Sequence, residues 1–182
     1  VEDEIEVTAR FMPFELNPDL PPEGKDQKKH LSEVYRRSAE EVAAMRAQLH
    51  AAADRAGFPM AWDGEGEEPA AMMWNTFDAH KLLRWALAEA GPEAQARLKV
   101  ALLEAHFQRR RNVSDREVLL ELAETQGFDR ARAAAALDDE ALAIAVRSEE
   151  QRGRQVGINS VPSFVVDGKY LIQGARDPAE YA

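Results

Sequence analysis

The sequence predicts an α/β protein whose small sheet is interrupted by a long helical insertion. Two observations lead to this fold class. Near both ends of the chain, apolar and polar residues alternate with a period of two, which is the spacing of a strand with one buried face. The long middle part instead repeats its apolar residues at helical spacings. At 182 residues, the chain fits one domain with a large insertion.

The first strand is expected over residues 5–11, whose odd-numbered positions are apolar and whose even-numbered positions are polar. Pro13 and Pro18 end this strand, because proline has no N–H to donate to a sheet. Residues 18–24 hold three prolines and a glycine, so we expect a loop there.

Six helices are expected in the middle of the chain. Gly57 and the Gly91–Pro92 pair stop helices, while Ser114 and Asp129 are suited to cap them. Ser114 is followed three residues later by Glu117, which is the pattern of a capping box. The last helix opens at Asp138 or Asp139. The expected ranges are 28–57, 76–90, 93–109, 115–127, 129–137 and 138–156.

The chain is expected to return to strands near its end. Residues 163–166 and 169–173 have the composition of two short strands. Asp167–Gly168 between them is a strong signal for a two-residue hairpin turn of type I′. Asp177 and Pro178 are suited to cap and begin one more helix.

Three short strands make a poor sheet by themselves. A strand that pairs in parallel with another needs a crossover connection, and the first expected strand has no element before it. We therefore expect a strand and a helix, about 20 residues at average element lengths, to precede Val1 in the intact protein. The final helix likewise stops in its first turn at Ala182.

Composition excludes several classes of function. Acidic residues outnumber basic ones by 33 to 23, and the formal net charge is −10. Nucleic acid is not an expected partner, because binding phosphates needs clustered Lys and Arg, and the dense basic run at residues 109–111 has the character of a solvated helix end. No apolar stretch reaches the roughly 18 residues of a membrane span. The absence of cysteine excludes disulfides and thiolate metal sites within the chain.

Three segments carry most of the information in the sequence. They are residues 11–18 (Phe-Met-Pro-Phe-Glu-Leu-Asn-Pro), residues 75–83 (Asn-Thr-Phe-Asp-Ala-His-Lys-Leu-Leu) and residues 156–166 (Val-Gly-Ile-Asn-Ser-Val-Pro-Ser-Phe-Val-Val), the last continuing to Ile-Gln-Gly-Ala at 172–175. In this order and at these spacings, the chain resembles DsbA-like thioredoxin-fold proteins of the FrnE type. The resemblance extends from Ile5 to Tyr181.

The resemblance implies a thioredoxin-like fold with an inserted all-helical domain. Residues 1–24 and 157–182 would form a partial thioredoxin-like domain, and residues 25–156 would form the insertion. It also implies thiol–disulfide exchange through a Cys-x-x-Cys pair at a helix N-terminus, a place that lowers the pKa of a thiol. That N-terminal βα unit would lie before Val1, so we expect the chain itself to be redox-inactive.

The resemblance also gives two residues of this chain a role. In thioredoxin-like folds, a cis-proline at the place of Pro162 faces the cysteine pair. The backbone of Val161, just before it, would pair with an extended substrate. Without the resemblance, a trans proline that opens an edge strand is the simpler interpretation.

Four further residues are candidates to line the cleft: Phe14, Asn75, Phe77 and His80. Asn75 is also well placed to cap a helix, and His80 has the surroundings of a half-buried structural histidine. Glu15 is expected to fix the proline-rich turn through bonds from its side chain to the backbone. The four histidines are too dispersed to predict a metal site.

Three functions remain open from the sequence. The first is disulfide exchange by an oxidoreductase of the DsbA type. The second is a glutathione-dependent isomerase or transferase, related to 2-hydroxychromene-2-carboxylate isomerases and the kappa class, which share the fold but use a serine in place of the first cysteine. The third is a non-catalytic thioredoxin-like module that binds peptides. The residues that precede Val1 distinguish the three.

The oxidoreductase hypothesis implies a thiol- or disulfide-containing peptide or small molecule as substrate, and no cofactor; glutathione would enter only under the isomerase hypothesis. A second copy of the chain is another candidate partner, since it would complete the sheet by swapping. The acidic start, Val1 to Glu4, has the wrong sign for a signal peptide, and we expect a cytoplasmic protein. The missing initiator methionine is equally compatible with a cleaved signal.

Overall fold

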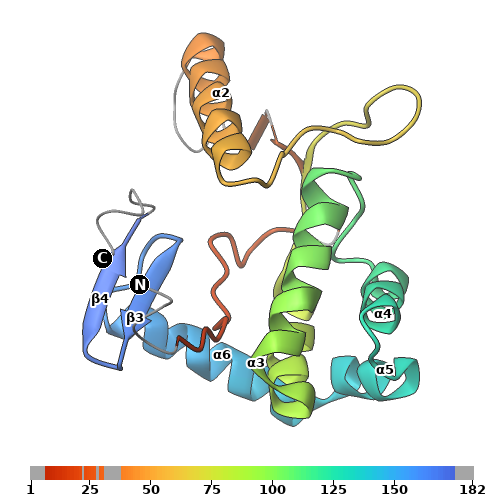
Figure 1. Ribbon diagram of the computed structural model, residues 1–182, viewed down its shortest axis with the longest axis vertical. Helices are drawn as coiled ribbons and strands as arrows, with labels where there is room; N and C mark the ends of the chain where they lie inside the picture. Colours follow the sequence, from red (N-terminus) through yellow and green to blue (C-terminus); the bar gives the residue numbers. More distant parts are fainter. Residues whose placement is uncertain (1–6, 22, 28, 31–37, 175–182) are drawn as a thin grey trace.

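The computed structural model describes residues 7–21, 23–27, 29–30 and 38–174 (Figure 1). Helices dominate these residues, and two short two-stranded antiparallel sheets accompany them, which agrees with the predicted α/β class and its helical insertion. The helices are α2 (Ala39–Arg55), α3 (Phe77–Phe107), α4 (Arg116–Thr125), α5 (Arg130–Asp138) and α6 (Glu140–Gln155). The strands are β1 (Lys25–Asp26), β2 (Met72–Met73), β3 (Ser163–Val166) and β4 (Tyr170–Gln173).

The element α3 consists of two helices joined by a sharp reversal. Gly91 interrupts it with φ 83° and ψ −178°, a conformation that glycine adopts without strain. Beyond the break, the Gln95 side chain donates a hydrogen bond of 3.2 Å to the carbonyl of Leu83. In a straight helix these two residues would lie about 18 Å apart, so the two halves run back along each other. The helix end that the sequence predicts at Gly91–Pro92 is confirmed.

Aspartates cap α4, α5 and α6. Asp115, Asp129 and Asp139 each accept hydrogen bonds from backbone N–H groups in the first turn of the helix that follows. The prediction that Ser114 caps α4 is wrong. Ser114 lies one residue too early, and both its N–H and its hydroxyl donate to Oδ1 of Asn112, at 2.9 and 2.6 Å.

The hydrophobic core lies where α3 packs against α4 and α5. Trp85 and Phe128 contact each other at its edge, with ring centroids 5.2 Å apart. Lys81 is buried as well, and its Nζ donates a hydrogen bond of 2.7 Å to the carbonyl of Leu137 near the end of α5, where a cation is favourable. The largest apolar members of the core are Leu82, Leu83, Leu98, Leu102, Leu119, Leu120, Leu122, Phe128 and Leu137.

Residues 7–20, here called the strap, include no strand and end in a turn, in which the N–H of Leu20 donates to the carbonyl of Asn17 at 3.3 Å. The predicted strand over residues 5–11 is therefore wrong for its described part, and residues 5 and 6 lie outside the described residues. The side-chain amide of Gln95 takes the place of a partner strand. The N–H of Phe11 donates to Oε1 of Gln95 at 2.9 Å, and Nε2 of Gln95 donates to the carbonyl of Phe11 at 2.8 Å. The strap thus satisfies its backbone groups at Phe11 without a sheet.

The helix α2 begins later than the sequence predicts. Ser38 and Glu41 form a capping box, in which the Ser38 hydroxyl accepts from the Glu41 N–H at 3.2 Å and the Glu41 carboxylate accepts from the Ser38 N–H at 2.9 Å. The predicted helix over residues 28–57 is interrupted at this cap, and residues 31–37 lie outside the described residues. Figure 1 shows α2 at one end of the molecule, and none of its residues whose burial is described is buried.

The hairpin of β3 and β4 turns at the predicted Asp167–Gly168, but three residues, 167–169, separate the paired positions Val166 and Tyr170, so the prediction of a two-residue loop is wrong. Asp167 and Gly168 adopt φ values of 51° and 66°, the two left-handed residues of a type I′ turn. Large apolar side chains are exposed on both faces of the hairpin: Phe164, Val165, Val166, Tyr170 and Leu171. Figure 1 places the hairpin on one side of α3 and the α4–α5 pair on the other. The helix predicted after Asp177 lies outside the described residues.

The division into residues 1–24 and 157–182 against residues 25–156 stays a prediction. Across that proposed boundary, the strap contacts α3 through Gln95 and α6 through Glu150. Within the ranges that the structure describes, no helix is long and apolar enough to traverse a bilayer.

Replacing Gln95 by alanine tests the importance of the strap contact. Gln95 is fully buried, and its loss leaves the N–H and carbonyl of Phe11 without their partners. We expect the free energy of unfolding in urea to fall by about 2 to 4 kcal/mol. Gln108→Ala is the matched control, because the half-buried side chain of Gln108 makes one solvent-exposed bond to the Pro59 carbonyl, and it should cost less than about 1 kcal/mol. Equal effects of the two substitutions would contradict the role given to Gln95.

The identity of the residue that caps α4 can be tested by substitution. Asp115→Ala removes the side chain that accepts from the N–H groups of Glu117 and Val118, so unfolding should become easier by about 1 kcal/mol. Ser114→Ala leaves that cap in place and should change the stability less. Thermal or urea unfolding of both variants measures the difference in stability. A larger loss of stability for Ser114→Ala would support the capping box at Ser114 that the sequence predicts.

Candidate functional site

The loop that carries Val161 and Pro162 connects α6 to β3. The Val161–Pro162 peptide bond is cis, the isomer that the family resemblance implies. Hydrogen bonds hold the loop against the end of β4: the carbonyl of Pro162 accepts from the N–H of Gly174 at 2.8 Å, and Nε2 of Gln173 donates to the carbonyl of Gly157 at 3.1 Å. Val161 is 49% exposed, and its backbone makes no hydrogen bond to the part of the chain that the structure describes.

Phe14 packs against the end of α6, where this loop begins. A Cβ at Gly153 would lie 3.5 Å from the Phe14 ring and 3.9 Å from the side chain of Ile158, so both apolar side chains lie beside a residue that has no side chain. The guanidinium of Arg154 lies 5.1 Å from the ring centroid of Phe14. Nη2 of the same arginine donates to the carbonyl of Glu15 at 3.2 Å. The strap is therefore fastened close to the start of the proline loop.

Phe77, the first residue of α3, faces α6. The guanidinium carbon of Arg147 lies 3.7 Å from its ring centroid, which is a close cation–π contact. Both residues line a shallow pocket of about 460 Å³ together with Ile144, Ser148 and Gln151. Ile144 is 68% exposed, so the pocket has an apolar wall that is open to solvent.

A pair of buried carboxylates, Glu15 and Glu150, lies beside Arg147; they are 2% and 1% exposed. Nη1 of Arg147 donates to Oε2 of Glu15 and, at 3.2 Å, to Oε2 of Glu150. Oε1 of Glu150 accepts from the backbone N–H of Glu15 at 3.1 Å. The turn-fixing role predicted for Glu15 is therefore wrong, because its side chain is engaged by α6 instead.

The environment of Glu15 disfavours its charge. Its Oε1 is buried and has no hydrogen-bond partner among the described residues. Burial and the neighbouring Glu150 carboxylate raise the pKa of Glu15 above its usual value of 4.5, although Arg147 and Arg154 act in the opposite direction.

Asn75 fastens the other end of the strap to α3. Its Oδ1 accepts from the N–H of Phe77 at 3.0 Å, and its Nδ2 donates to the carbonyl of Leu20 at 3.3 Å. Thr76 occupies the N-cap position of α3 without a side-chain bond. This geometry matches the interpretation of Asn75 as a helix cap.

His80 lies one turn farther along α3 and makes no hydrogen bond or ion pair with the proline loop in the described ranges. Burial lowers its pKa from 6.5 to about 4, and the charge of Lys99 on the returning half of α3 adds to the shift. Burial also lowers the pKa of Lys99, whose Nζ lies 5.3 Å from the ring centroid of Phe11. Burial and the charge of Lys99 therefore both favour the neutral form of His80, and the two half-buried side chains are neighbours.

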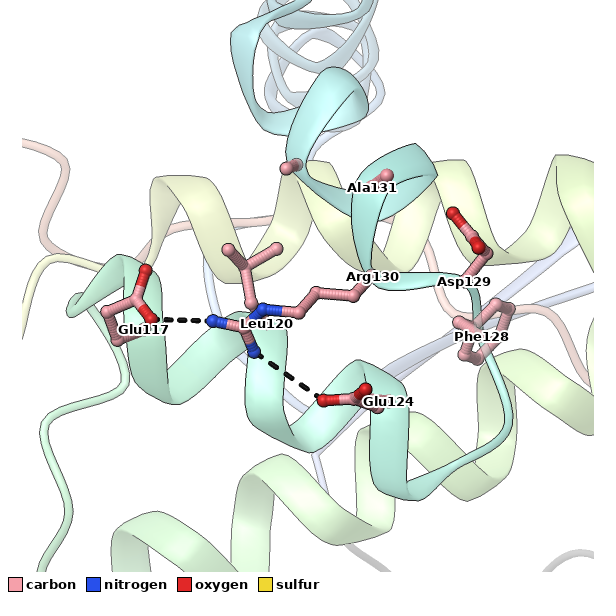
Figure 2. Close-up of a pocket in the computed structure, with 8 residues that line it drawn as sticks. Glu117, Leu120, Glu124, Phe128, Asp129, Arg130 and Ala131 are labelled. Carbon is pink, nitrogen blue, oxygen red and sulfur yellow. Dashed lines mark hydrogen bonds and ion pairs between the residues drawn. The ribbon is translucent and has the colours of Figure 1, made fainter.

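A second depression, of about 640 Å³, lies between α4 and α5 (Figure 2). Arg130 crosses it and pairs with Glu117 at 2.6 Å and with Glu124 at 3.7 Å. Asp129 at its edge accepts from the N–H of Arg132 as the cap of α5. These charged groups hold α4 to α5, on the side of α3 away from the hairpin, so the depression has a structural explanation.

The sequence found part of this site and missed the rest. It indicated Phe14 and Phe77, and the structure brings both onto α6. It missed Arg147 and Glu150, because charged residues along a helix usually mark a solvated face. The one available signal was Glu15, a carboxylate enclosed by apolar residues in the strap.

The arrangement offers binding groups rather than a nucleophile. Val161 presents an exposed backbone, and Phe77 with Arg147 forms one wall of a pocket. The described residues contain no group of three His, Asp or Glu side chains placed to hold a metal ion, and the sequence contains no cysteine.

Comparison with known proteins identifies the family. No curated protein matches this chain. Among solved structures, a probable DsbA oxidoreductase from Streptomyces coelicolor has a TM-score of 0.74 and 29% sequence identity, over 92% of this chain and 69% of that chain. A family model of the DSBA-like thioredoxin domain matches residues 2–182. Because that match spans nearly the whole sequence, the chain belongs to the DSBA-like thioredoxin domain family.

Proposed function

We propose that this chain is the substrate-binding part of a DsbA-like thiol–disulfide oxidoreductase. The observation that carries the proposal is the exposed Val161–Pro162 loop in a chain of this family. The N–H and carbonyl of Val161 are unpaired in the described structure, and an extended peptide can bond to such groups as an added strand. The substrate class is a peptide or small molecule that contains a thiol or a disulfide.

The chemistry of the proposal needs a group that these residues do not supply. In disulfide exchange, a thiolate attacks one sulfur of a disulfide, forms a mixed disulfide and releases the other sulfur as a thiolate. The 182 residues contain no cysteine. The proposed activity therefore depends on a Cys-x-x-Cys pair outside them, which the family resemblance puts before Val1. A FrnE-like subtype and a cytoplasmic location belong to the same proposal and rest on the sequence motifs alone.

A second candidate is a module that binds peptides without catalysis, which neither a Cys-x-x-Cys pair nor a serine before Val1 would favour. Such a module would use the same loop, because backbone pairing at Val161 requires no thiol. A serine in place of the first cysteine would instead favour the glutathione-dependent isomerases and transferases. The residues that precede Val1 in the intact gene product separate these candidates.

The 182-residue chain is expected to leave the rate of insulin reduction by dithiothreitol unchanged, because it holds no thiol to form the mixed disulfide. Turbidity of the released insulin chains measures the rate. The intact gene product serves as the comparison and should accelerate the reaction if it carries the cysteine pair. Acceleration by the cysteine-free chain would contradict the first expectation, and an inactive intact product with both cysteines would contradict the oxidoreductase.

The role of Val161 can be tested by amide exchange in the intact protein. A mixed disulfide with a substrate peptide should slow hydrogen exchange at the N–H of Val161, because that group gains a partner. The N–H of Asp167, at the tip of the hairpin, is the internal control and should exchange at an unchanged rate. Unchanged exchange at Val161 in the trapped complex would show that the substrate binds elsewhere.

A further inference from the structure

The contact between the strap and α6 concentrates like charges in a buried place. Glu15 and Glu150 are both almost fully buried, and a single nitrogen of Arg147 donates to both carboxylates. Burying a carboxylate is costly unless its oxygens are paired. Oε1 of Glu15 has no partner in the described structure, so this pairing is incomplete.

Glu15 faces side chains of two helices, α6 and α3. From α6 they are Arg147, Glu150 and Arg154, and Arg154 directs its Nη2 at the backbone carbonyl of Glu15 rather than at its carboxylate. From α3, Phe77 covers the guanidinium of Arg147, and no charged side chain of α3 bonds to Glu15 in the described ranges. Two carboxylates therefore share one directly bonded cation.

We propose that Glu15 is a proton-linked latch, which fastens the strap to α6 most firmly when its carboxyl group carries a proton. Protonation removes one of the two buried negative charges that share Arg147, and it leaves the guanidinium to balance the charge of Glu150 alone. Loss of the proton places two negative charges beside each other again and weakens the contact between the strap and α6.

The direction of the pH effect follows from this arrangement. Burial and Glu150 raise the pKa of Glu15 above 4.5, so the seated strap binds a proton more tightly than the released strap does. The stabilisation is complete below pH 4.5 and is lost as the pH rises through the raised pKa. Because Phe14 on the strap and Ile158 at the base of the Val161–Pro162 loop both lie beside Gly153, the latch connects proton binding to that loop.

Hydrogen exchange of the strap amides tests the latch without any redox assay. The N–H groups of Phe11 and Glu15 are bonded to Gln95 and Glu150. After correction for intrinsic exchange, their protection should fall with rising pH by at most about tenfold per pH unit, because one proton is linked to opening.

Glu15→Gln, which mimics the protonated group, should make this protection independent of pH. Glu149→Gln is the matched control, since Glu149 lies on the same helix and pairs with Arg84 at 2.8 Å; it should keep the pH dependence of the parent. A slope that persists in Glu15→Gln, or that is absent from the parent, would overturn the proposal.

A direct titration covers the case in which Glu15→Gln fails to fold. Carbon-13 NMR of the Glu15 carboxyl in the unsubstituted chain should show a midpoint above 4.5. A midpoint at or below 4.5 would refute the latch.

Discussion

The pairing of the Gln95 side-chain amide with the backbone of Phe11 is the interaction on which the rest of the arrangement depends. Gln95 stands just after the reversal of α3, where it also bonds to the carbonyl of Leu83. One buried side chain thus joins the two halves of α3 and the strap. From that point the strap continues along α6, and Asn75 holds its far end at Leu20. The position of Phe14 beside the proline loop follows from these attachments.

The contacts that Glu15 makes with α6 are polar, although its side chain is buried. Buried polar groups must be paired with good geometry, so they select one register of the strap more strictly than apolar contacts would. A shift of the strap by one residue would separate the N–H of Glu15 from Glu150 and remove the Phe14 ring from Arg154. The contact between the strap and α6 is therefore specific. Because one carboxylate oxygen of Glu15 is unpaired in it, its strength depends on whether Glu15 is protonated.

Features that depend on neighbours in sequence could be predicted from the sequence. The stop at Gly91–Pro92, the caps at Asp129 and Asp139 and the turn at Asp167–Gly168 all follow from local backbone chemistry. The cap of α4 was misassigned because Ser114 and Asp115 are adjacent and both suit the role. The strand predicted at residues 5–11 failed for another reason: alternation indicates a face suited to burial, but it does not supply a partner strand, and Val7 is 68% exposed.

The same distinction holds for the candidate site. Val161 and Pro162 were indicated by a motif that resembles a known family, and the fold agrees with that family. The network around Glu15 left almost no trace in the sequence, because Glu15 and Arg147 are 132 positions apart. The apolar neighbours of Glu15 mark it as unusual, but nothing around Arg147 in the sequence links the two residues, and only the folded chain joins them.

This separation has a consequence for the order in which the molecule assembles. The contacts of α3 with α4 and α5 join elements that follow one another, so this part can form as soon as those helices have been synthesised. The bond from Glu15 to Glu150 spans 135 positions. Glu15 therefore leaves the ribosome long before its partner, and its charge stays hydrated until α6 is complete. Docking of the strap onto α6 removes that charge from water, and it follows the folding of the helices.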